Sequence, residues 1–129
     1  MGSTLAVAVG GALGSVARYL VAELFAALGL AAYPWGTLVA NVAGCLLIGL
    51  IVALTGPDGR LLVSPELRLF WVTGICGGFT TFSTFALQIL TFLQTGDSGW
   101  AWLYLIDSVV LCLLAVWLGY AAGAWLNRI

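Results

Sequence analysis

Four long apolar runs make up most of this chain of 129 residues. They cover Leu5–Leu30, Trp35–Leu54, Leu67–Leu93 and Trp100–Leu126. Each run is close to the roughly 20 residues that an α-helix needs to cross a bilayer, and a segment in hydrocarbon must satisfy its own backbone hydrogen bonds. We therefore predict an all-α membrane protein with four transmembrane helices, folded as a single domain over residues 1–129.

Composition argues against several classes of function. The chain is 63% hydrophobic and 7% charged, and it holds four arginines, no lysine and no histidine. A nucleic-acid-binding protein needs a basic surface, and many catalytic sites need imidazole, so we expect neither a nucleic-acid partner nor an enzyme. Cys45, Cys76 and Cys112 lie inside apolar runs without paired spacing, which favours small buried side chains over a disulfide or a zinc site.

The connections between the runs predict the orientation of the chain. With four spans, both termini and the long connection Thr55–Glu66 lie on one side, together with Arg60, Arg68 and Arg128. The other two connections carry no positive charge. The positive-inside rule then makes the arginine-bearing side cytoplasmic.

Small residues are concentrated in the first run and recur in the second and fourth. The first contains Gly10-Gly11-Ala12-Leu13-Gly14-Ser15-Val16-Ala17, and single glycines follow at Gly44, Gly49, Gly119 and Gly123. Small residues let helix backbones approach closely in a membrane. We expect these positions to pack helices together rather than to contact a transported species.

The third run contains the most unusual stretch, Gly77-Gly78-Phe79-Thr80-Thr81-Phe82-Ser83-Thr84-Phe85. Two adjacent glycines weaken a helix, and four hydroxyl residues follow them. A broken membrane helix is tolerated only where protein or a water-filled cavity satisfies the freed groups, and such breaks often build ion sites. We predict that the third helix is broken near its middle. Exposed carbonyls there would suit a cation, and the restarted half-helix would direct its positive N-terminus at an anion.

Three polar side chains inside the predicted helices need an explanation. Arg18 is in the first run and Asp107 in the fourth, at a similar depth from the same end. Because a bare charge is costly there, either the two form an ion pair, or each faces a water-filled vestibule or snorkels to the membrane interface. Asn41 is a lone amide in the second run, and it either links two helices by hydrogen bonds or donates to an anion.

Two side-chain patterns have both a structural and a functional interpretation. Tyr104, Ser108 and Cys112 recur every four residues and so share one helix face, which indicates either a polar track or ordinary packing. Phe82 and Phe85 share a face in the third run, and aromatic stripes are usually part of a core. Their rings nevertheless have a positive edge that can stabilise an anion without a fixed charge.

On these residues the sequence resembles the Fluc (CrcB) family of fluoride channels. The resemblance covers the whole chain, including the glycine-rich segment that leads to Arg18 and the segment Pro34-Trp35-Gly36-Thr37-Leu38-Val39-Ala40-Asn41. Its most specific part is Gly77–Phe85. The resemblance implies a passive fluoride-selective channel, which exports cytoplasmic fluoride down its electrochemical gradient and so reduces fluoride toxicity. The implied location is the plasma membrane of a bacterium or archaeon.

The resemblance also implies an assembly and a pathway. The assembly is an antiparallel, dual-topology dimer with two fluoride pores, in which the backbone carbonyls of Gly77 and Thr80 bind a structural Na⁺ on the dimer axis. Two-fold symmetry would raise these two carbonyl ligands to four. The implied fluoride pathway combines ring edges, hydroxyls, an amide and a vestibule arginine: Phe82, Phe85, Ser83, Thr84, Tyr104, Ser108, Asn41 and Arg18.

Three features depart from the family pattern. The family often has Ser-x-Glu after the second phenylalanine, where this chain has Ala86-Leu87-Gln88, and Cys112 stands where a hydroxyl is frequent. The arginine asymmetry also conflicts with dual-topology insertion, so a heterodimer with a paralogue stays open beside the homodimer.

Two other classes of protein stay open as alternatives. A small multidrug-type proton-coupled transporter has four spans too, but it needs a carboxylate deep in its first span, and Glu23 is close to the end of that run. A non-transporting tetraspan assembly subunit would explain the small residues. It would not explain the broken third helix with its hydroxyl and phenylalanine series.

Overall fold

The computed structural model describes residues 2–30 and 32–129, and within them the chain forms helices and connections without strands. Three spans are single helices: α1 (Gly2–Ala27), α2 (Trp35–Leu54) and α6 (Ser98–Leu126). The remaining span consists of four consecutive pieces: α3 (Pro65–Leu69), the π-helix η1 (Phe70–Cys76), α4 (Gly77–Phe79) and α5 (Phe82–Gln94). Taken together over Pro65–Gln94, these pieces join the other three helices in being long and apolar enough to cross a membrane. The prediction of an all-α protein with four membrane-spanning helices is confirmed.

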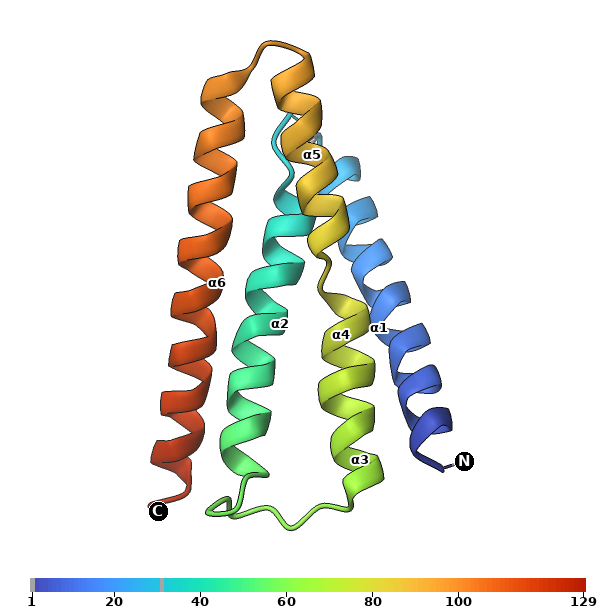
Figure 1. The fold of residues 1–129 in the computed structure, drawn as a ribbon, viewed down its shortest axis with the longest axis vertical. Coiled ribbons are helices and arrows are strands. Elements are labelled where there is room, and N and C mark those ends of the chain that lie inside the picture. The colour runs from blue at the N-terminus through green and yellow to red at the C-terminus, as the bar shows by residue number, and fades with distance from the viewer. Residues whose placement is uncertain (1, 31) are drawn as a thin grey trace.

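The spans alternate in direction (Figure 1). The two termini and the connection between α2 and α3 lie at one end of the molecule, as predicted, and the other two connections lie at the opposite end. α2 has a central place: α6 packs along it on one side, and α1 and the third span lie on the other.

The third span is broken, as predicted, but not at its paired glycines. Gly77 and Gly78 are helical and belong to α4. The residues that leave the helix are Thr80 (φ −87°, ψ 156°) and Thr81 (φ −151°, ψ 121°), both of which are extended. The position of the break is therefore not determined by the low helix propensity of the glycines. It is determined by hydrogen bonds between Thr81 and Asn41 of the neighbouring helix α2.

α1 packs against the third span through glycines that are four residues apart on both helices. Gly10 and Gly14 of α1 are buried. A Cβ atom on Gly10 would lie 2.9 Å from the Cα atom of Gly74, and one on Gly14 would lie 3.1 Å from the backbone carbon of Gly78. Because glycine has no side chain, the two backbones can approach closely here, and no room is left for a Cβ atom. Packing by the small residues of the first run is confirmed.

α2 and α6 form the most extensive helix pair, and glycines lie at this contact as well. A Cβ atom on Gly49 would overlap the carbonyl of Val116, and one on Gly119 would overlap the carbonyl of Leu46. Both glycines are buried. The packing role that the sequence predicts for them is confirmed.

Aromatic side chains form the core next to the helix break. Tyr33, Leu38, Phe85 and Tyr104 are buried together. The ring of Tyr33 meets that of Tyr104 edge to face at 5.5 Å, and Phe85 meets Tyr104 at 5.2 Å. This cluster holds the restarted half-helix α5 against α2 and α6.

The long connection is fastened to the end of α6. The backbone N–H of Arg60 donates to Asn127 Oδ1 (3.0 Å), and its guanidinium Nη1 donates to the carbonyl of Leu126 (2.9 Å). Asn127 Nδ2 in turn donates to the carbonyl of Ala53 on α2 (2.9 Å). Arg60 thus places positive charge at a helix C-terminus, where the helix dipole favours it.

Candidate functional site

The break in the third span is held by Asn41 of α2. Asn41 Nδ2 donates to the carbonyl of Thr81 (3.1 Å), and the backbone N–H of Thr81 donates to Asn41 Oδ1 (2.7 Å). The side-chain amide therefore pairs with the extended backbone of Thr81 on both sides. Of the two interpretations of Asn41, the link between helices is confirmed.

Thr81 begins the second half of the helix. Its Oγ1 accepts from the backbone N–H of Thr84 (3.2 Å), which is the standard N-cap arrangement. The same hydroxyl lies 3.1 Å from Thr84 Oγ1 and 3.3 Å from Ser83 Oγ. The hydroxyls of Ser83 and Thr84 are therefore part of a small network at the start of α5.

These two sets of hydrogen bonds leave two carbonyl groups without their helical donors. In a continuous helix the carbonyl of Gly77 would accept from the N–H of Thr81, and that of Thr80 from the N–H of Thr84. The first N–H is bonded to Asn41 and the second to Thr81 Oγ1. Gly77 and Thr80 are the two residues whose carbonyls are expected, from the sequence resemblance alone, to bind a cation.

Arg18 supports a third carbonyl at the break. Its Nε donates to the carbonyl of Gly78 (3.3 Å), and Ser15 Oγ makes a longer contact with the same oxygen (3.5 Å). Arg18 lies on α1, which packs on the third span, whereas Asp107 lies on α6 across α2. The ion pair between Arg18 and Asp107 that the sequence left open is wrong, because the two helices are on opposite sides of α2.

Asp107 has a different partner. The hydroxyl of Tyr33, in the connection before α2, donates to Asp107 Oδ2 (3.1 Å). Burial, together with this hydrogen bond, raises the pKa of the Tyr33 hydroxyl, so the phenol keeps its proton and remains a donor. The partly buried carboxylate thus has a phenol hydroxyl as its partner rather than a cation.

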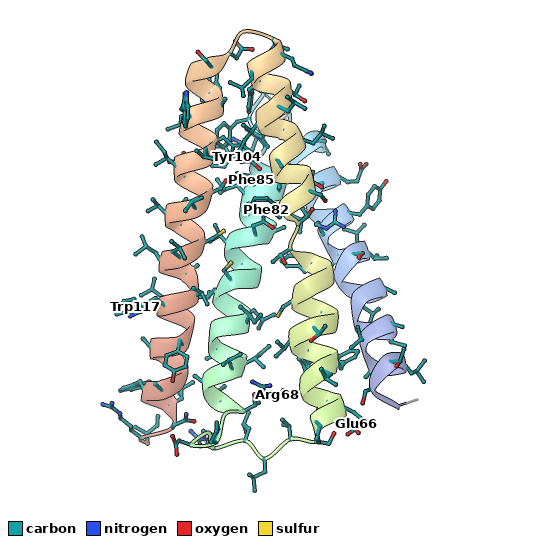
Figure 2. All side chains as sticks on the ribbon, in the orientation of Figure 1. Glu66, Arg68, Phe82, Phe85, Tyr104 and Trp117 are labelled. Carbon is teal, nitrogen blue, oxygen red and sulfur yellow. The ribbon has the colours of Figure 1, made fainter. Side chains whose placement is uncertain are left out.

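A groove with a volume of about 350 Å³ lies beside the break. Residues of α2, the third span and α6 line it, among them Asn41, Gly77, Phe82, Phe85 and Ser108. Phe82 is 78% exposed, whereas Phe85 is 5% exposed, and their ring centres are 5.4 Å apart with a tilt of 55°. Figure 2 shows the two rings one above the other, with Tyr104 above them. One ring is thus part of the core, and the other stands free at the groove.

Ser108 provides a buried hydroxyl at the groove. Its side chain is 4% exposed and lines the groove, and among the described residues its Oγ has no hydrogen-bond partner. A buried hydroxyl normally finds a partner in the protein. Ser108 can therefore donate to a small species that enters the groove, and the thiol of Cys112 lines the same groove one helical turn away.

Behind the groove a chain of hydrogen bonds connects three spans. The hydroxyl of Tyr104 donates to Gln88 Oε1 (2.8 Å), and Gln88 Nε2 donates to Thr37 Oγ1 (3.0 Å). Tyr104 is fully buried. Its hydroxyl proton is donated to Gln88. Tyr104 therefore supports the residues behind the groove and is not one of the residues that line it.

Comparison with known proteins connects this arrangement with a family. Residues 5–120 match the family described as CrcB-like protein, Camphor Resistance (CrcB). The chain belongs to the CrcB-like family.

Three curated relatives show how much of a CrcB-like chain is shared. A protein of Rhodospirillum rubrum is 48% identical over 96% of this chain and 96% of its own length. A protein of Paramagnetospirillum magneticum is 51% identical over 95% of each chain, and one of Opitutus terrae is 50% identical over 97% of this chain and 95% of its own. All three are named fluoride-specific ion channel FluC. The family is one of ion channels, so the prediction that the chain is not an enzyme is confirmed.

The structure brings most, but not all, of the predicted CrcB-like site residues to one place. Six of them line the groove: Asn41, Gly77, Thr80, Phe82, Phe85 and Ser108. The other four lie beside or behind it: Arg18 at the Gly78 carbonyl, Ser83 and Thr84 at the start of α5, and Tyr104 behind Phe85.

Sequence reasoning missed three contributors to the site. In the sequence Thr81 is one of four neighbouring hydroxyl residues, whereas in the structure its backbone pairs with Asn41 and its hydroxyl caps α5. Thr37 and Tyr33 support the core through Gln88 and Asp107. Tyr33 lies next to Pro34 and Thr37 lies at the start of α2, so neither belongs to a repeating pattern of polar residues in the sequence. These contacts are visible only in the fold.

Proposed function

We propose that this chain is a fluoride-specific ion channel. The observation that carries the proposal is the identity of about half of all residues with proteins named fluoride-specific ion channel FluC, over 95% or more of each chain. The groove beside the helix break supports it, because the polar groups that line the groove belong to uncharged residues.

The chemistry of fluoride fits such a groove. Fluoride is small and strongly hydrated, so a pore has to replace its water shell without holding the ion too firmly. A free hydroxyl at Ser108, the second N–H of the Asn41 amide and the ring edges of Phe82 and Phe85 are neutral groups that can do this. An arginine inside the groove would bind the anion too strongly, and Arg18 donates instead to the Gly78 carbonyl on the α1 side of the third span.

The proposed direction of transport is outward across the inner membrane. Hydrogen fluoride enters a cell as a neutral molecule and dissociates in the less acidic cytoplasm, where the anion stays trapped. A negative-inside membrane potential drives a permeant anion out, at about 2.3 kcal/mol per charge per 100 mV. A passive pore is then sufficient to lower the fluoride concentration in the cell.

We also propose that the chain works as an antiparallel homodimer with two pores and a structural Na⁺ between the subunits, with a heterodimer of paralogues as the alternative. The carbonyls of Gly77 and Thr80 fit a cation because their helical donors are engaged elsewhere, and carbonyls at a half-helix C-terminus and in unwound backbone are suitable Na⁺ ligands. Gly77 is exposed on the face of the third span that carries the groove, so a second chain can reach it. When bound, Na⁺ would fix the two subunits to one another.

A growth experiment tests the proposed function in cells. A bacterium that lacks its own fluoride exporter, and therefore stops growing at low fluoride concentration, is given this chain. We expect the chain to restore growth in fluoride and the Phe82→Ile variant to restore it poorly at equal expression. Growth that stays fluoride-sensitive with well-expressed, membrane-inserted wild type would contradict the proposal.

Replacement of sodium tests the proposed ion site separately. Purified chain in sodium-free buffer with a large organic cation should lose its dimeric size on chromatography, and sodium should restore it. A dimer of equal stability in both buffers would argue against the sodium site, although the fluoride channel itself would not be affected by that result.

A further inference from the structure

A second hollow lies at the end of α2 where the termini are found. It has a volume of about 210 Å³ and opens between α2, the long connection and the start of the third span. Its walls are apolar and include Ile51, Leu61, Val63, Leu67 and Trp71. The same hollow also includes one cationic side chain, that of Arg68.

Arg68 reaches across the hollow from the third span to α2. Its Nε donates to Thr55 Oγ1 (3.3 Å), and Thr55 Oγ1 donates to the carbonyl of Ile51 (2.7 Å). Figure 2 shows Arg68 between the two helices, whereas Glu66 points to the opposite side of the third span. Among the described residues only the Nε atom of Arg68 makes a hydrogen bond, and the two terminal nitrogens of its guanidinium can bind a further ligand. A planar fork of this kind binds phosphate through two hydrogen bonds.

The position of Arg68 along the membrane normal matches a lipid headgroup. The third span begins here, with Ser64 as N-cap (Leu67 N–H to Ser64 Oγ, 3.2 Å) and Pro65 as its first residue. Arg68 is in the first turn, and Trp71, which is 41% exposed, follows one turn deeper, as aromatic residues at the membrane interface do. The hollow continues from there along α2 as far as Leu47. A cation therefore lies at headgroup level above an apolar cavity.

We infer that this hollow binds one anionic glycerophospholipid, with the phosphate on the Arg68 guanidinium and part of an acyl chain against α2 and the third span. Charge complementarity identifies the occupant, because a second protein chain placed here would have to bury the Arg68 charge. Anionic lipids are attracted to basic pockets between helices at the membrane surface. The inference does not depend on fluoride transport.

Native mass spectrometry of the purified chain in mild detergent tests the inference. The chain is titrated with dioleoylphosphatidylglycerol and, separately, with dioleoylphosphatidylcholine. We expect one phosphatidylglycerol to be retained per chain, with at least fivefold weaker retention of phosphatidylcholine. Arg68→Gln should remove this preference. Arg128→Gln is the matched control, because it removes the same charge at the same end but outside the hollow, and it should bind like the wild type.

A variant in the wall of the hollow makes the test independent of Arg68. Val63→Trp fills the cavity from the connection and should reduce lipid retention while the guanidinium is present. Arg68→Lys keeps the charge without the fork, and we expect a weakened preference for the anionic lipid. Equal retention of the two lipids by the wild type would overturn the inference. So would unchanged retention in Val63→Trp, or an equal effect of Arg68→Gln and Arg128→Gln.

Discussion

Asn41 and Thr81 are joined by two hydrogen bonds in opposite directions, of 3.1 Å and 2.7 Å, between one side-chain amide and one backbone residue. The amide provides the hydrogen bonds that the backbone of Thr81 would otherwise make within a continuous helix. Because it takes the N–H of Thr81, it also frees the carbonyl of Gly77. A single side chain of α2 thus stabilises the break and leaves the Gly77 carbonyl without its helical donor.

Asn41→Leu should destabilise the protein and stop fluoride transport. The substitution leaves the N–H and carbonyl of Thr81 without partners, and each unsatisfied buried group costs about 1–3 kcal/mol. We expect a lower free energy of unfolding in detergent and fluoride flux close to that of protein-free liposomes. Gln94→Leu, at the exposed end of α5, is the matched control and should change neither quantity. An Asn41→Leu protein with wild-type stability would show that the two bonds do not hold the break.

Substitution of the two phenylalanines should separate transport from stability. Phe82 is largely exposed, so Phe82→Ile should reduce fluoride flux at unchanged stability. Phe85 is packed on Tyr104, so Phe85→Ile should reduce flux and also cost about 1–3 kcal/mol of stability, as shape changes in a packed core do. Flux from liposomes and unfolding of the same preparations check both statements. If Phe82→Ile conducts like the wild type, the exposed ring has no role in the pathway.

Adjacent glycines of α1 should respond in opposite ways to alanine. Gly10→Ala places a methyl group against the backbone of Gly74, and we expect a loss of about 1–3 kcal/mol from overpacking. A Cβ atom on Gly11 has no neighbour within 4 Å, so Gly11→Ala should be neutral or should stabilise the helix by up to about 1 kcal/mol. Unfolding of the two variants side by side measures the difference. Equal effects would contradict the close helix approach described for Gly10.

Tyr33 and Asp107 should show coupling in a double-mutant cycle. Tyr33→Phe removes the donor to the partly buried Asp107 carboxylate, at a cost of about 1–3 kcal/mol. Asp107→Asn replaces the charge by a neutral group, so Tyr33→Phe in that background should cost less. The free energies of unfolding of the four proteins give the coupling energy. Strict additivity would mean that the 3.1 Å contact contributes nothing to stability.

The helices could be predicted from the sequence because a chain segment in lipid has to satisfy its own backbone hydrogen bonds. Runs of about 20 apolar residues have few alternatives to a helix, and α2 is found with the predicted bounds, Trp35–Leu54. The glycines of α1 likewise predicted a close contact, which Gly10 and Gly14 make. In both cases a local pattern determines the outcome.

The details of the break could not be predicted because they depend on groups that are distant in the sequence. Gly77 and Gly78 are the weakest helix formers of their stretch, yet they are helical, and the break lies where Asn41, 40 residues earlier, competes for the N–H of Thr81. Arg18 and Asp107 have similar depths by sequence, but they belong to α1 and α6, which lie on opposite sides of α2. Depth along a helix can be read from a sequence, whereas the side on which a helix packs cannot.

The most direct test of this account is the voltage-driven release of halides from liposomes that contain this chain alone. The liposomes are loaded with equal potassium fluoride and potassium chloride, a potassium ionophore sets the voltage, and two ion-selective electrodes record the halides that leave. We expect fluoride to leave without any proton gradient while chloride is retained. Release of both halides together, or fluoride release no faster than from protein-free liposomes, would contradict it.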